Sequence, residues 1–135
     1  MMRVALLLVA LALPAGALAQ PLTIKLGESW AFAVKDGQPV RAHRVKPTAK
    51  PARGEIKASV AGLGGTTMTL INNSAISYTY RAQLLGLPSK AATRTCTLPA
   101  KMQPSLEYWP LKATAIRLSD FRPAKGAGSC PKPGG

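Results

Sequence analysis

The chain has 135 residues, with 18 Lys or Arg against only 5 Asp or Glu, so its formal net charge at pH 7 is +13. This length accommodates one domain. One His and two Cys cannot by themselves complete a four-ligand zinc site, and five scattered carboxylates leave few groups for acid–base catalysis. The composition therefore argues against an enzyme and predicts no metal and no cofactor.

The first 19 residues have the order of a secretory signal peptide. Residues 1–3 (Met-Met-Arg) are basic, residues 4–13 are apolar, and residues 17–19 (Ala-Leu-Ala) suit cleavage. The apolar run is shorter than the roughly 20 residues that span a bilayer. We expect removal of residues 1–19, a mature chain that begins at Gln20 without a transmembrane segment, and a periplasmic or secreted location.

Apolar and polar residues alternate repeatedly through the first half of the mature chain, which is typical of half-buried strands. Asp36-Gly37 lies between two such stretches, where a two-residue hairpin turn requires positive φ. The alternation predicts strands over residues 22–26, 30–35, 40–45 and 56–61.

The strongest alternation lies further along, over residues 76–84. It follows a β-branched stretch at 66–71 and an Asn-Asn-Ser turn cluster at 72–74. A weaker strand is predicted at 91–98 and a last one at 114–119, with an irregular, proline-punctuated segment over residues 101–110. From Arg122 onward, Pro and Gly predict an unpacked tail.

About eight short strands predict an all-β sandwich or small barrel. The strand, Asn-rich turn and strand over residues 66–84 resemble the central hairpin of small immunoglobulin-like domains in exported bacterial proteins. The resemblance implies a single immunoglobulin-like antiparallel β-sandwich of about 7–8 strands, with the domain at 20–121 and the tail at 122–135. The side chains expected to face inward are those of Trp30, Phe32, Met68, Leu70, Ile76, Tyr78, Tyr80 and Ile116.

The two cysteines, Cys96 and Cys130, are predicted to form a disulfide, because an even pair in an exported protein is usually oxidised. The bond would tie the Pro/Gly-rich tail back to the domain. The alternative is a pair of free thiols. A redox pair is less expected than either, because the spacing is unlike that of a Cys-x-x-Cys motif.

A run of basic residues between positions 41 and 57 is the most distinctive candidate site, and only Glu55 opposes it. It consists of Arg41, Arg44, Lys46, Lys50, Arg53 and Lys57. A charged edge that blocks sheet pairing, or simple solubility, accounts for part of it. The segment contains no aromatic residue for base stacking, so nucleic acid is not the expected partner. We instead expect a surface for anions.

Catalytic alternatives find little support. A catalytic triad would need His43 as the base, Asp36 to orient it, and Ser29 or Ser59 as the nucleophile. Nothing in the sequence places these residues together, and no Gly-x-Ser-x-Gly elbow is present to expose a serine. Residues 62–65 lack the Lys-Ser/Thr ending of a phosphate-binding loop. A hydrolase would require convergence of the isolated carboxylates, which are Glu28, Asp36, Glu55, Glu107 and Asp120.

The sequence thus predicts a non-catalytic binding or structural module of the cell envelope. Its basic segment would contact anionic envelope components, namely lipid head groups, lipopolysaccharide or acidic polymers, or else an envelope protein. The alternative function is that of a small exported inhibitor or a chaperone-like partner of another protein. That alternative would need an exposed apolar patch or an open sheet edge.

Overall fold

The computed structural model describes residues 19–88, 92–93 and 95–125. Over these residues the predicted all-β class is confirmed: nine strands form two antiparallel sheets, without a helix. No described helix is therefore long and apolar enough to cross a membrane. Apart from Ala19, the predicted signal peptide lies outside the described residues, and so does the predicted tail beyond Lys125.

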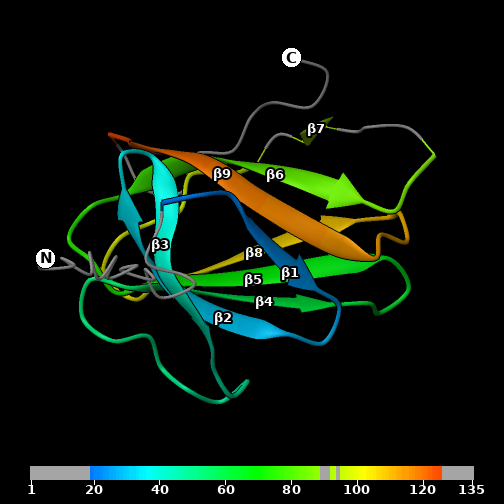
Figure 1. The fold of residues 1–135 in the computed structure, drawn as a ribbon, viewed down its shortest axis with the longest axis horizontal. Coiled ribbons are helices and arrows are strands. Elements are labelled where there is room, and N and C mark those ends of the chain that lie inside the picture. The colour runs from blue at the N-terminus through cyan, green and yellow to red at the C-terminus, as the bar shows by residue number, and fades with distance from the viewer. Residues whose placement is uncertain (1–18, 89–91, 94, 126–135) are drawn as a thin grey trace, which may run out of the picture.

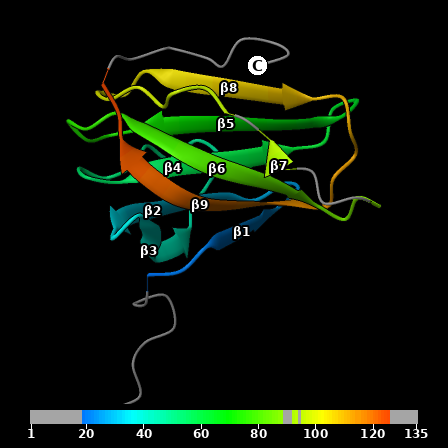
Figure 2. The ribbon, with the colours of Figure 1, turned by 90° about the horizontal axis from the view of Figure 1, so that it is seen from above.

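The strands, in chain order, are β1 (Leu22–Lys25), β2 (Ser29–Lys35), β3 (Gln38–Arg44), β4 (Ile56–Ala61), β5 (Thr66–Asn72), β6 (Tyr78–Leu85), β7 (Ala92–Thr93), β8 (Pro104–Trp109) and β9 (Ala115–Pro123). One sheet has the order β1-β9-β6-β7 and the other the order β3-β2-β4-β5-β8. The chain passes between the sheets four times, after β1, β5, β7 and β8. Figure 1 shows β6 and β9 as a layer beside β4, β5 and β8, and Figure 2 shows the succession β8, β5, β4, β2.

The two sheets share one hydrophobic core, with Phe121 of β9 at its centre. Its ring packs edge-on against Phe32 of the other sheet, with 5.5 Å between the ring centroids. On its own sheet it stacks on Tyr80 at 5.5 Å and meets Tyr78 edge-on at 6.0 Å. The other fully buried large apolar side chains among the described residues are Ile24, Ile56, Met68, Leu70, Leu84, Leu98, Ile116, Leu118 and Val60. Burial of this apolar surface is the main force that holds the sheets together.

The predicted hairpin turn between β2 and β3 is confirmed. Asp36 and Gly37 have φ values of 52° and 78°, and Lys35 pairs directly with Gln38. Positive φ at both central residues is the conformation whose twist matches that of the flanking strands.

The pairing expected around the Asn-rich turn is wrong. β5 pairs with β4 and β8, whereas β6 pairs with β7 and β9, so the turn carries the chain from one sheet to the other. The Asn72 side chain is buried and donates to the Ile76 carbonyl at 2.7 Å, a bond that spans this crossing. Alternation alone does not distinguish two paired strands from two strands that face one core from opposite sheets.

The predicted core needs two corrections at its margins. Ile76 is 46% exposed, because β6 begins only at Tyr78 and Ile76 belongs to the crossing. Trp30 is half-buried against the edge of the core and is overlain by the guanidinium of Arg44. The other six side chains predicted to face inward are buried.

The segment predicted to be irregular contains a strand, β8. Its prolines bracket the strand instead of interrupting it: Pro104 is its first residue, where a missing donor is tolerated, and Pro110 follows its last. β9 also extends through Arg122 and Pro123, which were predicted to begin the tail. Among the described residues of the weak strand expected at 91–98, only β7 and a bridge between Tyr78 and Leu98 show strand pairing.

Candidate anion-binding surface

Five of the six predicted basic residues are exposed. Arg41 and Arg44 lie on β3, and Lys46, Lys50 and Arg53 lie on the loop that joins β3 to β4. This loop projects beyond the sheets in Figure 1. Strand β3 is an edge strand, so its arginines and the loop form one continuous border of the molecule.

Lys57 does not belong to this exposed set. It is only 6% exposed, and its ammonium group donates to the backbone carbonyl of Pro47. On the sheet it lies between Ala31 and Ile71, on the outer face that the loop after β3 covers. Lys57 therefore fastens the loop to the sheet, a role that a strand pattern alone does not reveal.

Arg44 is the one member of the exposed set with an acidic partner. Its guanidinium donates to Oε2 of Glu28 at 2.7 Å and lies 5.9 Å from the centre of the Trp30 ring. Oε1 of Glu28 accepts from the backbone N–H of Lys25 at 3.0 Å and from the Trp30 indole N–H at 3.2 Å. These contacts fix Glu28 beside β3 and leave Arg44 partly neutralised.

The Glu28 carboxylate supplies a pH-dependent contribution to stability. The N–H of Lys25 is the main cause that holds the pKa of this carboxyl below its usual value of 4.5, followed by the indole N–H of Trp30 and then by Arg44. Because the folded pKa is lowered, the contribution is present above pH 4.5 and is lost as the pH falls through the folded pKa.

We therefore expect Glu28→Gln to flatten the fall in the free energy of unfolding below pH 4.5. Urea unfolding of both proteins over a pH series measures this slope. Asp36→Asn removes a carboxylate from the exposed hairpin turn and is the matched control. A slope in Glu28→Gln as steep as in the parent would contradict the assignment.

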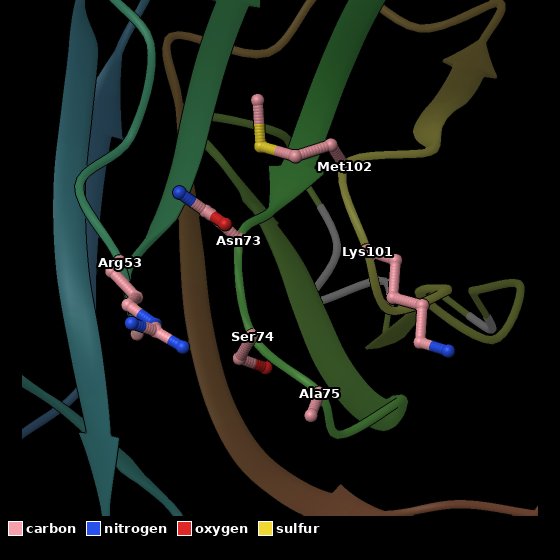
Figure 3. Close-up of a pocket in the computed structure, with 7 residues that line it drawn as sticks. Arg53, Asn73, Ser74, Ala75, Lys101 and Met102 are labelled. Carbon is pink, nitrogen blue, oxygen red and sulfur yellow. The ribbon is translucent and has the colours of Figure 1, made fainter.

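A hollow of about 540 Å³ lies next to Arg53, where three loops meet. Backbone hydrogen bonds hold the loops together, from Gly54 to Asn73 at 2.7 Å and from Lys101 to Ser74 at 3.0 Å. Figure 3 shows Arg53 and Lys101 on either side of the Asn73–Ala75 turn. The lining residues include these two cations and no carboxylate.

Lys101 therefore extends the basic border, although it is far away in the sequence. We use the name basic surface for the exposed set Arg41, Arg44, Lys46, Lys50, Arg53 and Lys101. Sequence reasoning missed Lys101, because only the tertiary fold brings the segment before β8 against the β3–β4 loop.

The positive charge of the basic surface is poorly compensated. All five carboxylates lie within the described residues, yet among the described Lys and Arg only Arg44 and Arg81 have a carboxylate within 4.0 Å. Glu107 is engaged by the backbone N–H of Cys96 at 2.7 Å, and Glu55 lies 3.7 Å from His43. An uncompensated cationic border attracts anions over a range that salt shortens.

The described contacts of His43, Ser29 and Ser59 do not include a catalytic hydrogen bond between the histidine and either serine. His43 Nδ1 lies 3.1 Å from the Arg41 carbonyl, and Ser29 and Ser59 hydrogen-bond to each other at 2.8 Å. Residues 62–65 join β4 to β5 in a hairpin. Among the described residues, no three His, Cys, Asp or Glu side chains are grouped so as to hold a metal ion.

Cys96 is not a free cysteine. Its predicted partner, Cys130, lies outside the described residues, so the pairing of these two residues stays a prediction.

No protein-family model, no curated protein and no solved structure matches this chain.

Proposed function

We propose that this protein is a non-catalytic binding module of the cell envelope whose basic surface contacts anionic components. One observation carries the proposal: exposed cations line the edge strand β3 and the β3–β4 loop, Arg53 and Lys101 line one hollow, and of these cations only Arg44 has a carboxylate partner among the described residues. The partners would be lipid head groups, lipopolysaccharide or acidic polymers, which share dense negative charge.

The proposal includes export and a β-sandwich architecture. The basic start, apolar run and small residues of positions 1–19 support a cleaved signal peptide. Two antiparallel sheets around a shared core support a sandwich. The crossing from β5 to β6 supports an immunoglobulin-like classification, since consecutive strands of such domains also pass from one sheet to the other.

Charge reversal on the basic surface tests the proposal. We expect the parent to bind phosphatidylglycerol vesicles and not phosphatidylcholine vesicles at low salt, with binding that fades above about 0.15 M ionic strength. Each cation near an anionic membrane contributes about 1 kcal/mol, so reversing Lys46, Lys50 and Arg53 to Glu should weaken binding about 100-fold or more. Vesicle co-sedimentation over a salt series measures the effect.

A matched control separates this surface from net charge. Lys35, Lys112 and Arg117 are exposed cations outside the basic surface, and reversing these three to Glu changes the net charge by the same amount. The control should retain most of the affinity. If both triple variants lose binding equally, or if the first binds as well as the parent, the basic surface is not the binding site.

The alternative, a small exported inhibitor or chaperone-like partner of another protein, is favoured by a different observation. Strand β8 leaves an apolar sheet edge exposed on the opposite border of the five-stranded sheet from β3.

A further inference from the structure

Strand β8 combines an unpaired edge with large exposed apolar side chains. It pairs with β5 on one side, and no described strand pairs with its other side. Leu106 is 66% exposed and Tyr108 55% exposed, and they lie opposite Thr69 and Thr67 on the outer face of the sheet. Alternate backbone N–H and C=O groups of such an edge point outward and are free to pair with another strand.

The other three sheet edges carry features that oppose strand addition. In β3, Arg41 has a φ of 54° beside a register shift against β2, and His43 and Arg44 add exposed polar and charged side chains. β1 has four residues and ends at Lys25, and β7 has only two residues.

β8 lacks most of these protections. It has six residues and no cation, and proline occurs only at its first position. Its single charged side chain, Glu107, is turned to the inner side, where it accepts from the backbone N–H of Cys96. An edge of this length with an apolar outer face is a template for pairing.

The charges at the two ends of β8 define the chemistry of the strand that would pair with it. Lys101 precedes the strand and Lys112 follows it; both are exposed, and neither has a carboxylate partner among the described residues. Antiparallel pairing with β8 of a second copy would place the lysine before one strand close to the lysine after the other, between two chains of net charge +13. Like charges at such an interface oppose association, whereas a segment with acidic ends would be attracted.

We propose that the free edge of β8 binds an extended segment of another protein as an added strand. Backbone hydrogen bonds would provide the affinity, alternate apolar side chains of the segment would pack beside Leu106 and Tyr108, and acidic residues at its ends would meet Lys101 and Lys112. This inference goes beyond the proposed anion-binding function and does not depend on it.

A designed peptide tests the proposal directly. The probe is a capped peptide of alternating Thr and Val with two Glu at each end, and its dissociation constant is measured by calorimetry with the full chain. We expect binding, together with slower amide hydrogen exchange in β8. A peptide with two central prolines, which removes donors from the strand, should not bind, and a peptide with Lys ends should bind more weakly.

A variant of β8 and a matched control locate the site. Leu106→Lys places a cation on the outer face of the strand and should weaken peptide binding about tenfold. Ile76→Lys makes the same change at an exposed apolar residue outside β8 and should leave the affinity unchanged. Equal affinity of the parent and Leu106→Lys, or no binding by the parent, would overturn the proposal.

Two further readouts complete the test. A parent dimer that Leu106→Lys dissociates, seen by light scattering, would assign the edge to a second copy and overturn the proposal. Binding of Leu106→Lys to phosphatidylglycerol vesicles should be no weaker than that of the parent, since the variant keeps every cation of the basic surface. Failure of peptide binding is thereby distinguishable from failure of the anion-binding function.

Discussion

Replacing Phe121 with Ala should lower the free energy of unfolding by about 3–5 kcal/mol. The side chain is 2% exposed, and its ring contacts Phe32 across the two sheets as well as Tyr78 and Tyr80 on its own sheet. Truncation would remove apolar burial and leave a cavity between the sheets, which rigid strands can only partly close. Urea unfolding followed by circular dichroism measures the loss.

An exposed aromatic residue supplies the control for this prediction. Tyr108→Ala removes a ring of similar size from the outer face of β8, where the side chain is more than half exposed, and should change stability by about 0.5 kcal/mol or less. If Phe121→Ala costs no more than Tyr108→Ala, the aromatic cluster does not join the sheets.

Phe121 illustrates why periodicity alone located only part of the core. Ile116 and Leu118 follow the inward period of two, but the next inward residue is Phe121 and not Asp120. Asp120 has a φ of 54°, next to a register shift between β6 and β9 that inserts an extra residue. Such a bulge re-aims all later side chains, and the sequence pattern gives no sign of where it occurs.

Local signals did predict much of the architecture. Alternation correctly assigned the inward faces of β5 and β6, and Asp36-Gly37 correctly marked the hairpin. Strand pairing was not predictable in the same way, because an inward-facing residue gives the same sequence pattern whichever sheet its strand belongs to. β5 and β6 are adjacent in sequence yet belong to different sheets, and this depends on contacts distant in sequence.

For the basic surface too, some features were predictable from nearby residues in the sequence and others depend on contacts distant in sequence. The exposure of Arg41, Lys46 and Lys50 follows from an edge strand and a polar loop. The burial of Lys57 depends on the return of that loop over the sheet, and the position of Lys101 depends on backbone bonds between three loops. Neither is encoded within a short window of sequence.

Loss of the predicted disulfide should have an effect of comparable size to that of the core truncation. Cys96 is not a free cysteine, and it lies in a segment that bridges the sheets, since its N–H donates to Glu107 of β8 while Leu98 pairs with Tyr78 of β6. A bond to Cys130 would close a loop of about 35 residues, which restricts the unfolded chain and contributes roughly 3–4 kcal/mol.

We therefore expect Cys96→Ser to lower the free energy of unfolding by about 3–4 kcal/mol, as measured by urea unfolding without reductant. Cys130→Ser and the double variant should lose the same amount, because each lacks the same single bond, and reductant should destabilise the parent but not the double variant. Thiol titration under denaturing conditions should find none in the parent and one in each single variant. Two titratable thiols in the parent purified without reductant would contradict the pairing.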